Sequence, residues 1–320
     1  MDRWAPERLK PWLQLGRFDR PAGIWLLMLP GWQGVALASA QGGRWPSPWL
    51  LLLFLIGAAV MRAAGCAYND AVDRDLDRKV TRTAGRPVAS GRISRRAAVV
   101  YAVGLSLVGL AVLLQMNMAA VLAGTASVVL VAAYPFMKRI TWWPQAWLGL
   151  TFNWGALVGW LAAGLGGPSV FQMLAGLEPA GGGRLDAIFS RDGVTTLWPM
   201  LLLYASGVFW TLGYDTIYAL QDLEDDALAG VKSSARWLGD GAVRAVKGFY
   251  VVSGLLALAA MGAAGLGGGW MFWAPFALHL MWQGSALRLG DTALALRLFK
   301  SNVRAGLLLF GALALCALQL

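Results

Sequence analysis

The sequence predicts an all-α fold, a polytopic membrane bundle of about nine transmembrane helices. Three observations predict it. Hydrophobic residues make up 58% of the 320 residues and charged residues only 14%, whereas soluble domains contain about 25% charged residues. Apolar runs of about 17 to 25 residues, the length that crosses a bilayer, recur along the chain. These runs contain many glycines and alanines, which let membrane helices approach closely.

The chain divides into a short N-terminal arm, residues 1–22, and a membrane domain, residues 23–320. Aromatic and leucine side chains alternate with basic ones in the arm, as in amphipathic segments that lie on membrane lipids. The nine expected spans of the domain are 23–41, 49–68, 95–114, 118–137, 144–165, 197–220, 243–264, 270–287 and 301–319. The connection at 166–196 is rich in glycine, and a short helix is expected at 170–174 within it.

The distribution of lysine and arginine predicts the orientation of the bundle. The net charge is +10, which in a soluble protein would suggest binding to nucleic acid. Here 23 basic residues fall in the segments on one side of the expected spans, and only Arg44, Arg184 and Arg191 fall on the other. By the positive-inside rule, we expect the N-terminus on the cytoplasmic side, most simply in a bacterial inner membrane. No nucleic acid and no obligate protein partner are expected.

An acidic stretch follows the second span, NDAVDRDLDRKVTRTAGRPVASG from Asn69. If the helix continues through it, Asn69, Asp73 and Asp77 share one face at spacings of four residues, with Asp70 one turn before Asp73. Carboxylates repel one another at this spacing unless a cation lies between them, and hard oxygen ligands suit Mg²⁺. The alternative is a solvated loop in which acids and bases pair.

A second acidic stretch, YDTIYALQDLEDDALAGVKSS, follows the sixth span. Its acidic and tyrosine side chains recur at helical spacing on one face, and its last members repeat the DxxxD pattern of the first stretch. Basic residues follow both stretches. The face is formed by Asp215, Tyr218, Asp222 and Asp226, with Asp225 adjacent. The basic residues Arg82 and Arg86 follow the first stretch, and Lys232 and Arg236 follow the second.

Two further polar features stand out within the apolar chain. Arg62 lies inside the second span, where a charge is costly and is a functional candidate; it is expected to bind an anion, either an aspartate or a substrate carboxylate, although it could snorkel to the interface. Tyr134, Lys138 and Arg139 end the fourth span on the same face as the acidic stretches. The positive-inside rule alone would also account for the last two.

Two carboxylate clusters with nearby cations suit a diphosphate. Mg²⁺ bridges carboxylate and phosphate oxygens, basic side chains take up the remaining charge, and the diphosphate becomes a good leaving group. The tail of an amphiphilic diphosphate would lie among the spans. Ionisation of an allylic diphosphate gives a carbocation that an electron-rich ring can attack.

These two stretches resemble the motifs of a known family. The first is similar to the NDxxDxxxD motif and the following RTxxRP of the UbiA superfamily of intramembrane aromatic prenyltransferases, and the second to its second aspartate motif. RFDRPAGIWLLMLPGWQG and YPFMKRITWWPQ also resemble the branch that acts in ubiquinone synthesis. The resemblance implies a helical bundle around a cavity open to the cytoplasmic face, Mg²⁺ dependence, and transfer of a polyprenyl chain from polyprenyl diphosphate to a ring carbon of 4-hydroxybenzoate.

Carried over by position, the resemblance also implies site residues. Metal ligation falls to the two aspartate motifs, and catalysis to their DxxxD pairs Asp73 with Asp77 and Asp222 with Asp226. Arg62 would hold the benzoate carboxylate. The metal ligands would be Asp70, Asp73, Asp77, Asp222, Asp225 and Asp226, and the substrate-binding residues Arg62, Asn69, Arg86, Lys138, Arg139 and Asp215. By their position beside these motifs, Arg82, Tyr134, Tyr218 and Lys232 are expected to bind substrate as well.

Other functions remain open at this point. A relative in the same superfamily could prenylate homogentisate, a naphthoate or haem. A CDP-alcohol phosphotransferase would need a DGxxAR pattern before its later aspartates, which neither stretch has. A cation-coupled transporter would place its acidic residues in broken helices near the bilayer centre, whereas these lie at the ends of spans.

Overall fold

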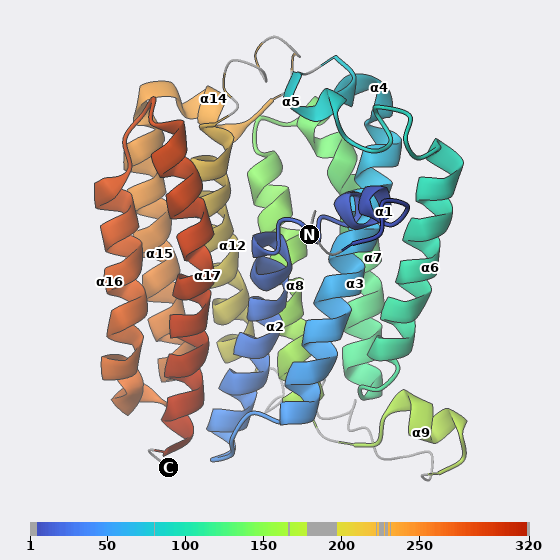
Figure 1. Ribbon diagram of the computed structural model, residues 1–320. Coiled ribbons are helices and arrows are strands. Elements are labelled where there is room, and N and C mark those ends of the chain that lie inside the picture. Colours follow the sequence, from blue (N-terminus) through green and yellow to red (C-terminus); the bar gives the residue numbers. More distant parts are fainter. Residues whose placement is uncertain are drawn as a thin grey trace.

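Long helices running side by side form the body of the molecule in the computed structural model (Figure 1). The structure describes residues 5–79, 81–165, 167–177, 197–221, 223, 227, 230 and 232–318, with only the backbone at 81, 82 and 138. Within these ranges the long helices are α2 (Ala22–Gln41), α3 (Pro48–Val72), α6 (Arg95–Leu113), α7 (Met118–Ile140), α8 (Pro144–Gly164), α12 (Trp198–Ala219), α15 (Ala242–Ala263), α16 (Trp270–Ala286) and α17 (Thr292–Leu315).

Each of the nine expected spans overlaps one of these helices. Six segments of the described chain are long and apolar enough to count as candidate membrane spans by themselves, and they lie in α2, α3, α6, α7, α15 and α17. The all-α membrane bundle is therefore confirmed, while nine as the number of spans stays a prediction. Short helices complete the described chain: α1 (Lys10–Leu15), α4 (Arg74–Asp77), α5 (Thr81–Ala84), α9 (Val170–Leu174), α14 (Ser234–Leu238), and the 3₁₀ turns η1 (Gly239–Gly241), η2 (Gly267–Gly269) and η3 (Cys316–Leu318).

The helix starts follow from local sequence. The Ser94 hydroxyl accepts a hydrogen bond from Ala97 N at 3.2 Å, and Asn117 Oδ1 accepts one from Ala120 N at 3.0 Å. Such N-caps satisfy backbone donors that have no partner within the helix. Pro48 and Pro144 occupy the first position of α3 and α8, where the fixed φ of proline is already helical.

The tightest packing joins α2 to α8 in the centre of the bundle. Gly34 of α2 lies against the backbone carbonyl of Ala156, and Gly159 of α8 lies against the carbonyl of Gly31. A Cβ at either glycine would overlap the facing carbonyl oxygen. The small residues that the sequence places in its spans thus bring two backbones into direct contact.

We expect Gly34→Ala to lower the thermal unfolding midpoint of the detergent-solubilised protein. The obstructing atom belongs to backbone and not to a flexible side chain, and overpacking of this kind costs about 1–3 kcal/mol. Gly104→Ala in α6 is the matched control, because no atom lies within 4 Å of a Cβ added there. Equal unfolding midpoints for the two variants would contradict this account of the α2–α8 contact.

A buried polar network holds α12 against the C-terminal helices. Trp210 Nε1 donates to Asn302 Oδ1 at 2.8 Å, the Tyr250 hydroxyl donates to Gln283 Oε1 at 2.8 Å, and Asn302 Nδ2 donates to the same oxygen at 3.0 Å. All four side chains are buried. Because every member has a partner, the network fixes the position of α12, whose last turns carry Asp215 and Tyr218.

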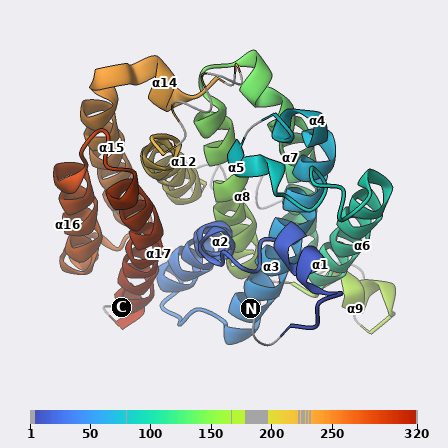
Figure 2. The ribbon, with the colours of Figure 1, turned by 45° about the horizontal axis from the view of Figure 1, so that its top comes forward.

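The two ends of the bundle differ. The short helices α4, α5 and α14 lie at one end, and α9 lies at the other (Figure 1). The short helix expected at 170–174 is confirmed as α9, whereas residues 178–196 lie outside the described chain. Viewed with the first end turned forward, α2 and α8 lie near the centre, with α12, α15, α16 and α17 on one side and α3, α6 and α7 on the other (Figure 2).

Candidate active site at the mouth of the central cavity

The first acidic stretch joins two helices and does not form one continuous helix. α3 ends at Val72, Asp73 caps it with φ −92° and ψ 9°, and α4 begins at Arg74. The backbone bonds Asp73 N to Asn69 O and Asp77 N to Asp73 O, both 2.8 Å, preserve the four-residue spacing across this break. Asp70, Asp73 and Asp77 are all buried, and they line the same cavity.

Three arginines from separate parts of the chain meet these carboxylates. Arg86 Nη1 lies 2.8 Å from Asp77 Oδ2 and 3.4 Å from Asp70 Oδ1. Arg139 Nη2 donates to Asp73 Oδ1 at 2.9 Å. Burial alone would lower the pKa of the Arg86 guanidinium, but the carboxylates of Asp70 and Asp77 outweigh it and raise that pKa above its ordinary value.

The third arginine, Arg17, was not among the expected site residues. Its Nη2 donates to both oxygens of Asp70, at 2.8 and 3.1 Å, and its Nη1 donates to Gln14 O at 3.0 Å. Arg17 has a φ of 58°, in the left-handed region that side chains rarely adopt. The available signal was its position in RFDRP, directly before a span and on the face of the acidic stretches.

The loop after α4 covers the acidic residues from the side. Arg78 Nε donates to Ala89 O at 2.8 Å, and the Thr83 hydroxyl donates to Asp77 O at 2.9 Å. Val88 and Ile93 pack with Leu15 of the arm and with residues of α3 and α6 in a small separate core. The arm and this loop therefore form one wall around the mouth of the cavity.

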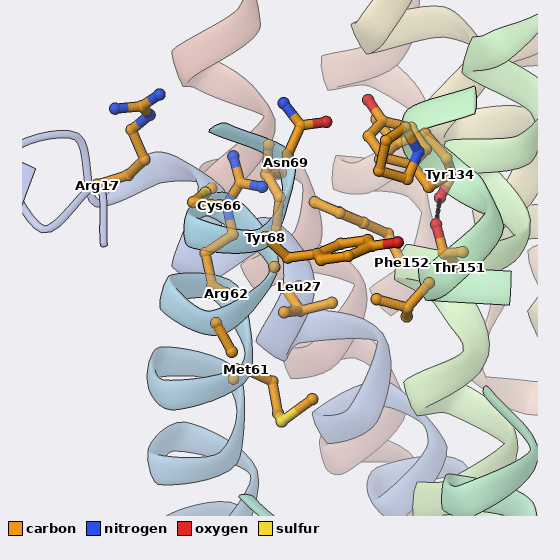
Figure 3. A pocket seen from close by; sticks show the side chains of 18 of the residues that line it. Arg17, Leu27, Met61, Arg62, Cys66, Tyr68, Asn69, Tyr134, Thr151 and Phe152 are labelled. Carbon is orange, nitrogen blue, oxygen red and sulfur yellow. Dashed lines mark hydrogen bonds between the residues drawn. The ribbon is translucent and has the colours of Figure 1, made fainter. Parts of the chain in front are cut away.

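The cavity itself has a volume of about 2030 Å³ and reaches from the acidic residues deep into the bundle. Arg62 projects into it from α3, and its guanidinium lies 5.5 Å from the centre of the Phe152 ring of α8 (Figure 3). Tyr134, Tyr214 and Tyr218 also line the cavity, as do apolar residues of α2, α6, α7 and α17. A polar mouth thus leads into a largely apolar interior, where the described residues include one half-buried arginine, Arg62.

The second acidic stretch reaches the same cavity with its described members. Asp215 and Tyr218 of α12 line it, and so does Lys232, whose Nζ donates to Ile140 O at 3.2 Å and lies 5.9 Å from the Trp142 ring. Asp222, Asp225 and Asp226 lie outside the described residues, and the side chains of Arg82 and Lys138 are likewise not described.

The sequence is similar to known proteins along most of its length. The model of the UbiA prenyltransferase family matches residues 27–317. A mitochondrial 4-hydroxybenzoate polyprenyltransferase of Bos taurus is 41% identical over 312 residues, which cover 96% of this chain and 75% of the relative. The protein of the same name from Arabidopsis thaliana is 41% identical and is matched over 98% of this chain and 70% of the relative.

Solved structures give the same assignment of fold. The apo structure of a UbiA homolog from Aeropyrum pernix K1 has a TM-score of 0.68 at 25% identity, over 90% of this chain and 96% of that chain. A UbiA homolog from Archaeoglobus fulgidus bound to GPP and Mg²⁺ has a TM-score of 0.63 at 16% identity, over 94% and 99%. From these matches, and from the cavity with its aspartate-lined mouth, we conclude that the chain is an integral membrane protein of the UbiA prenyltransferase family.

Proposed function

We propose that the chain is a 4-hydroxybenzoate polyprenyltransferase, which transfers a polyprenyl chain from its diphosphate to a ring carbon of 4-hydroxybenzoate in ubiquinone synthesis. One arrangement supports this activity above all. A single cavity carries buried carboxylates paired with arginines at its mouth and, deeper inside, the half-buried Arg62, whose Nε atom is fully buried. The first group suits a metal diphosphate and the second suits the carboxylate of the acceptor.

We infer that Mg²⁺ binds at the mouth through Asn69, Asp73 and Asp77, together with the second aspartate motif. Asn69 Oδ1 is buried and has no hydrogen-bond partner among the described residues, which fits an oxygen ligand. Among the described residues, no group of three or more acidic, histidine or cysteine side chains is placed to hold a metal ion without further ligands. Mg²⁺ commonly binds through one or two carboxylates and substrate phosphates, so the donor set is suitable. When bound, Mg²⁺ would neutralise the charge that develops on the departing diphosphate.

The side chains of the protein then have separate roles in the reaction. Arg86 and Arg139 stabilise the diphosphate as the allylic C–O bond breaks and its electron pair leaves with the diphosphate. Arg62 holds the acceptor carboxylate, so that the ring carbon beside the hydroxyl faces the allylic cation. A new C–C bond forms between the ring carbon and the allylic carbon, and that ring carbon gives up its proton to the released diphosphate. Apolar side chains of the cavity surround the prenyl tail and exclude water.

Localisation follows from the same bias of basic residues. The mouth lies at the end of the bundle that carries most of the lysines and arginines, which we assign to the cytoplasmic side of a bacterial inner membrane. The curated relatives described above are mitochondrial by name, so the assignment to a bacterial inner membrane rests on the charge bias alone.

The test is an assay of the purified protein in detergent with a polyprenyl diphosphate and a panel of acceptors. We expect prenylated product from 4-hydroxybenzoate with Mg²⁺, loss of product with EDTA, and recovery when Mg²⁺ is added in excess. Detergent removes any gradient, so a transporter would give no product. Product from homogentisate or a naphthoate but none from 4-hydroxybenzoate would contradict the proposed acceptor.

A further inference from the structure

The guanidinium of Arg62 lies directly against the first turn of a neighbouring helix. Gly23 is the second residue of α2. A Cβ built on it would lie 2.7 Å from Arg62 Nε, 3.0 Å from Nη2 and 3.2 Å from Cζ. Contacts below about 3 Å to a real Cβ do not occur, so the guanidinium occupies the space that any other residue at position 23 would fill.

The opposite neighbour of the guanidinium is an aromatic ring. Arg62 Cζ lies 5.5 Å from the centroid of Phe152 on α8, within the range of a cation–π contact. No hydrogen bond or ion pair of Arg62 is found among the described residues, and its Nε is buried without a partner. The guanidinium is therefore positioned by shape, between the backbone of α2 and the Phe152 ring, and not by a fixed protein anion.

We propose that Gly23 is the residue that determines specificity for a carboxylate-bearing acceptor, because it lets the Arg62 guanidinium dock on the first turn of α2. The inference rests on the proposed function, in which Arg62 binds the acceptor carboxylate. A guanidinium pairs best with a carboxylate through two parallel N–H donors in a fixed plane. Gly23 and Phe152 together define that plane, and neither of them needs to touch the reacting carbon.

Alanine at position 23 would displace the guanidinium and leave the fold intact. The atoms that a Cβ meets are the far end of a flexible side chain, whereas at Gly34 they belong to backbone. The guanidinium would move away from α2, and the ring of Phe152 limits the directions open to it. We therefore expect the acceptor to bind less well while the diphosphate, held at the mouth by other residues, binds as before.

The experiment compares Gly23→Ala with wild type in the full-length protein. We expect KM for 4-hydroxybenzoate to rise by roughly 10- to 100-fold, with KM for the polyprenyl diphosphate and the unfolding midpoint unchanged. Calorimetric titration with 4-hydroxybenzoate, without any turnover, should show the same loss of affinity. Gly262→Ala in α15 is the matched control, because no atom lies within 4 Å of its added Cβ; it should behave as wild type.

A double-mutant cycle separates a positioning role from a general structural one. If Gly23 acts through the guanidinium, Gly23→Ala should cause no further change in kcat/KM for 4-hydroxybenzoate when Arg62 is already methionine. An equal loss in both backgrounds, or wild-type affinity in the single variant, would overturn the inference. Failure of the proposed function is distinct, since wild-type protein would then neither bind nor prenylate 4-hydroxybenzoate.

Discussion

Replacing Asp73 with alanine should reduce prenyl transfer by about 1000-fold or more, in a protein that still folds in membranes. Asp73 is 3% exposed, sits at the break between α3 and α4, and accepts a hydrogen bond from Arg139 at 2.9 Å. In the proposed mechanism it also ligates Mg²⁺. Loss of one preorganised electrostatic group at a site of charge development typically costs 100- to 1000-fold in kcat, and here both a metal ligand and the partner of Arg139 are lost.

Asp75→Ala provides the control for this experiment. Asp75 lies on α4 between Asp73 and Asp77, but it is exposed and does not line the cavity. The two variants make the same change of charge within three residues, so general electrostatic effects should be equal. Turnover should be measured as prenylated product at saturating Mg²⁺. Near wild-type turnover by Asp73→Ala would show that the first acidic stretch is not the metal diphosphate site.

Replacing Arg62 with methionine should abolish useful binding of 4-hydroxybenzoate without destabilising the protein. Two charge-assisted hydrogen bonds to a carboxylate are worth about 3 kcal/mol or more in a buried site, so KM should rise by about 100-fold or more. Stability should be unchanged or increased, since replacing an unpaired buried charge by an apolar side chain removes a desolvation cost. Steady-state kinetics and a thermal unfolding curve measure the two effects.

A second arginine variant tests whether the rise in KM is specific to position 62. Arg96 is exposed near the start of α6 and does not line the cavity, so Arg96→Met should leave KM for the acceptor unchanged. If Arg62→Met retained wild-type KM, the acceptor carboxylate would have to bind elsewhere. The role of Gly23 would then fail with it, whereas the diphosphate site at the mouth would be unaffected.

The apolar runs of the sequence predicted the helices well, with errors that have a physical cause. The run at 95–114 corresponds closely to α6, Arg95–Leu113. The ninth run was expected to begin at residue 301, but α17 begins at Thr292, because the Asp291 carboxylate caps it and its first turns carry Arg297 and Lys300. Hydropathy detects only the part of a helix that lies in lipid, so it misses polar turns that extend beyond it.

The site was predictable in its residue types and less so in its contacts. Helical spacing alone placed Asn69, Asp73 and Asp77 together, although α3 ends between them. The pair of Arg17 with Asp70 joins residues 53 positions apart and depends on a left-handed backbone conformation at Arg17. The contact of Gly23 with Arg62 depends on how two helices pack. Neither of these two contacts can be predicted from periodicity or spacing, because both arise from tertiary structure.

The arginines around the acidic residues also affect how the enzyme takes up its substrates. In the described part of the mouth, Asp70, Asp73 and Asp77 are already matched by Arg17, Arg86 and Arg139. Within these ion pairs the charges balance, so a divalent ion or a pyrophosphate that binds alone would leave arginines or carboxylates without their partners. A divalent ion and a pyrophosphate that arrive together, with much of their charge mutually neutralised, disturb this balance least. Uptake of the two should therefore be synergistic, each raising the affinity for the other.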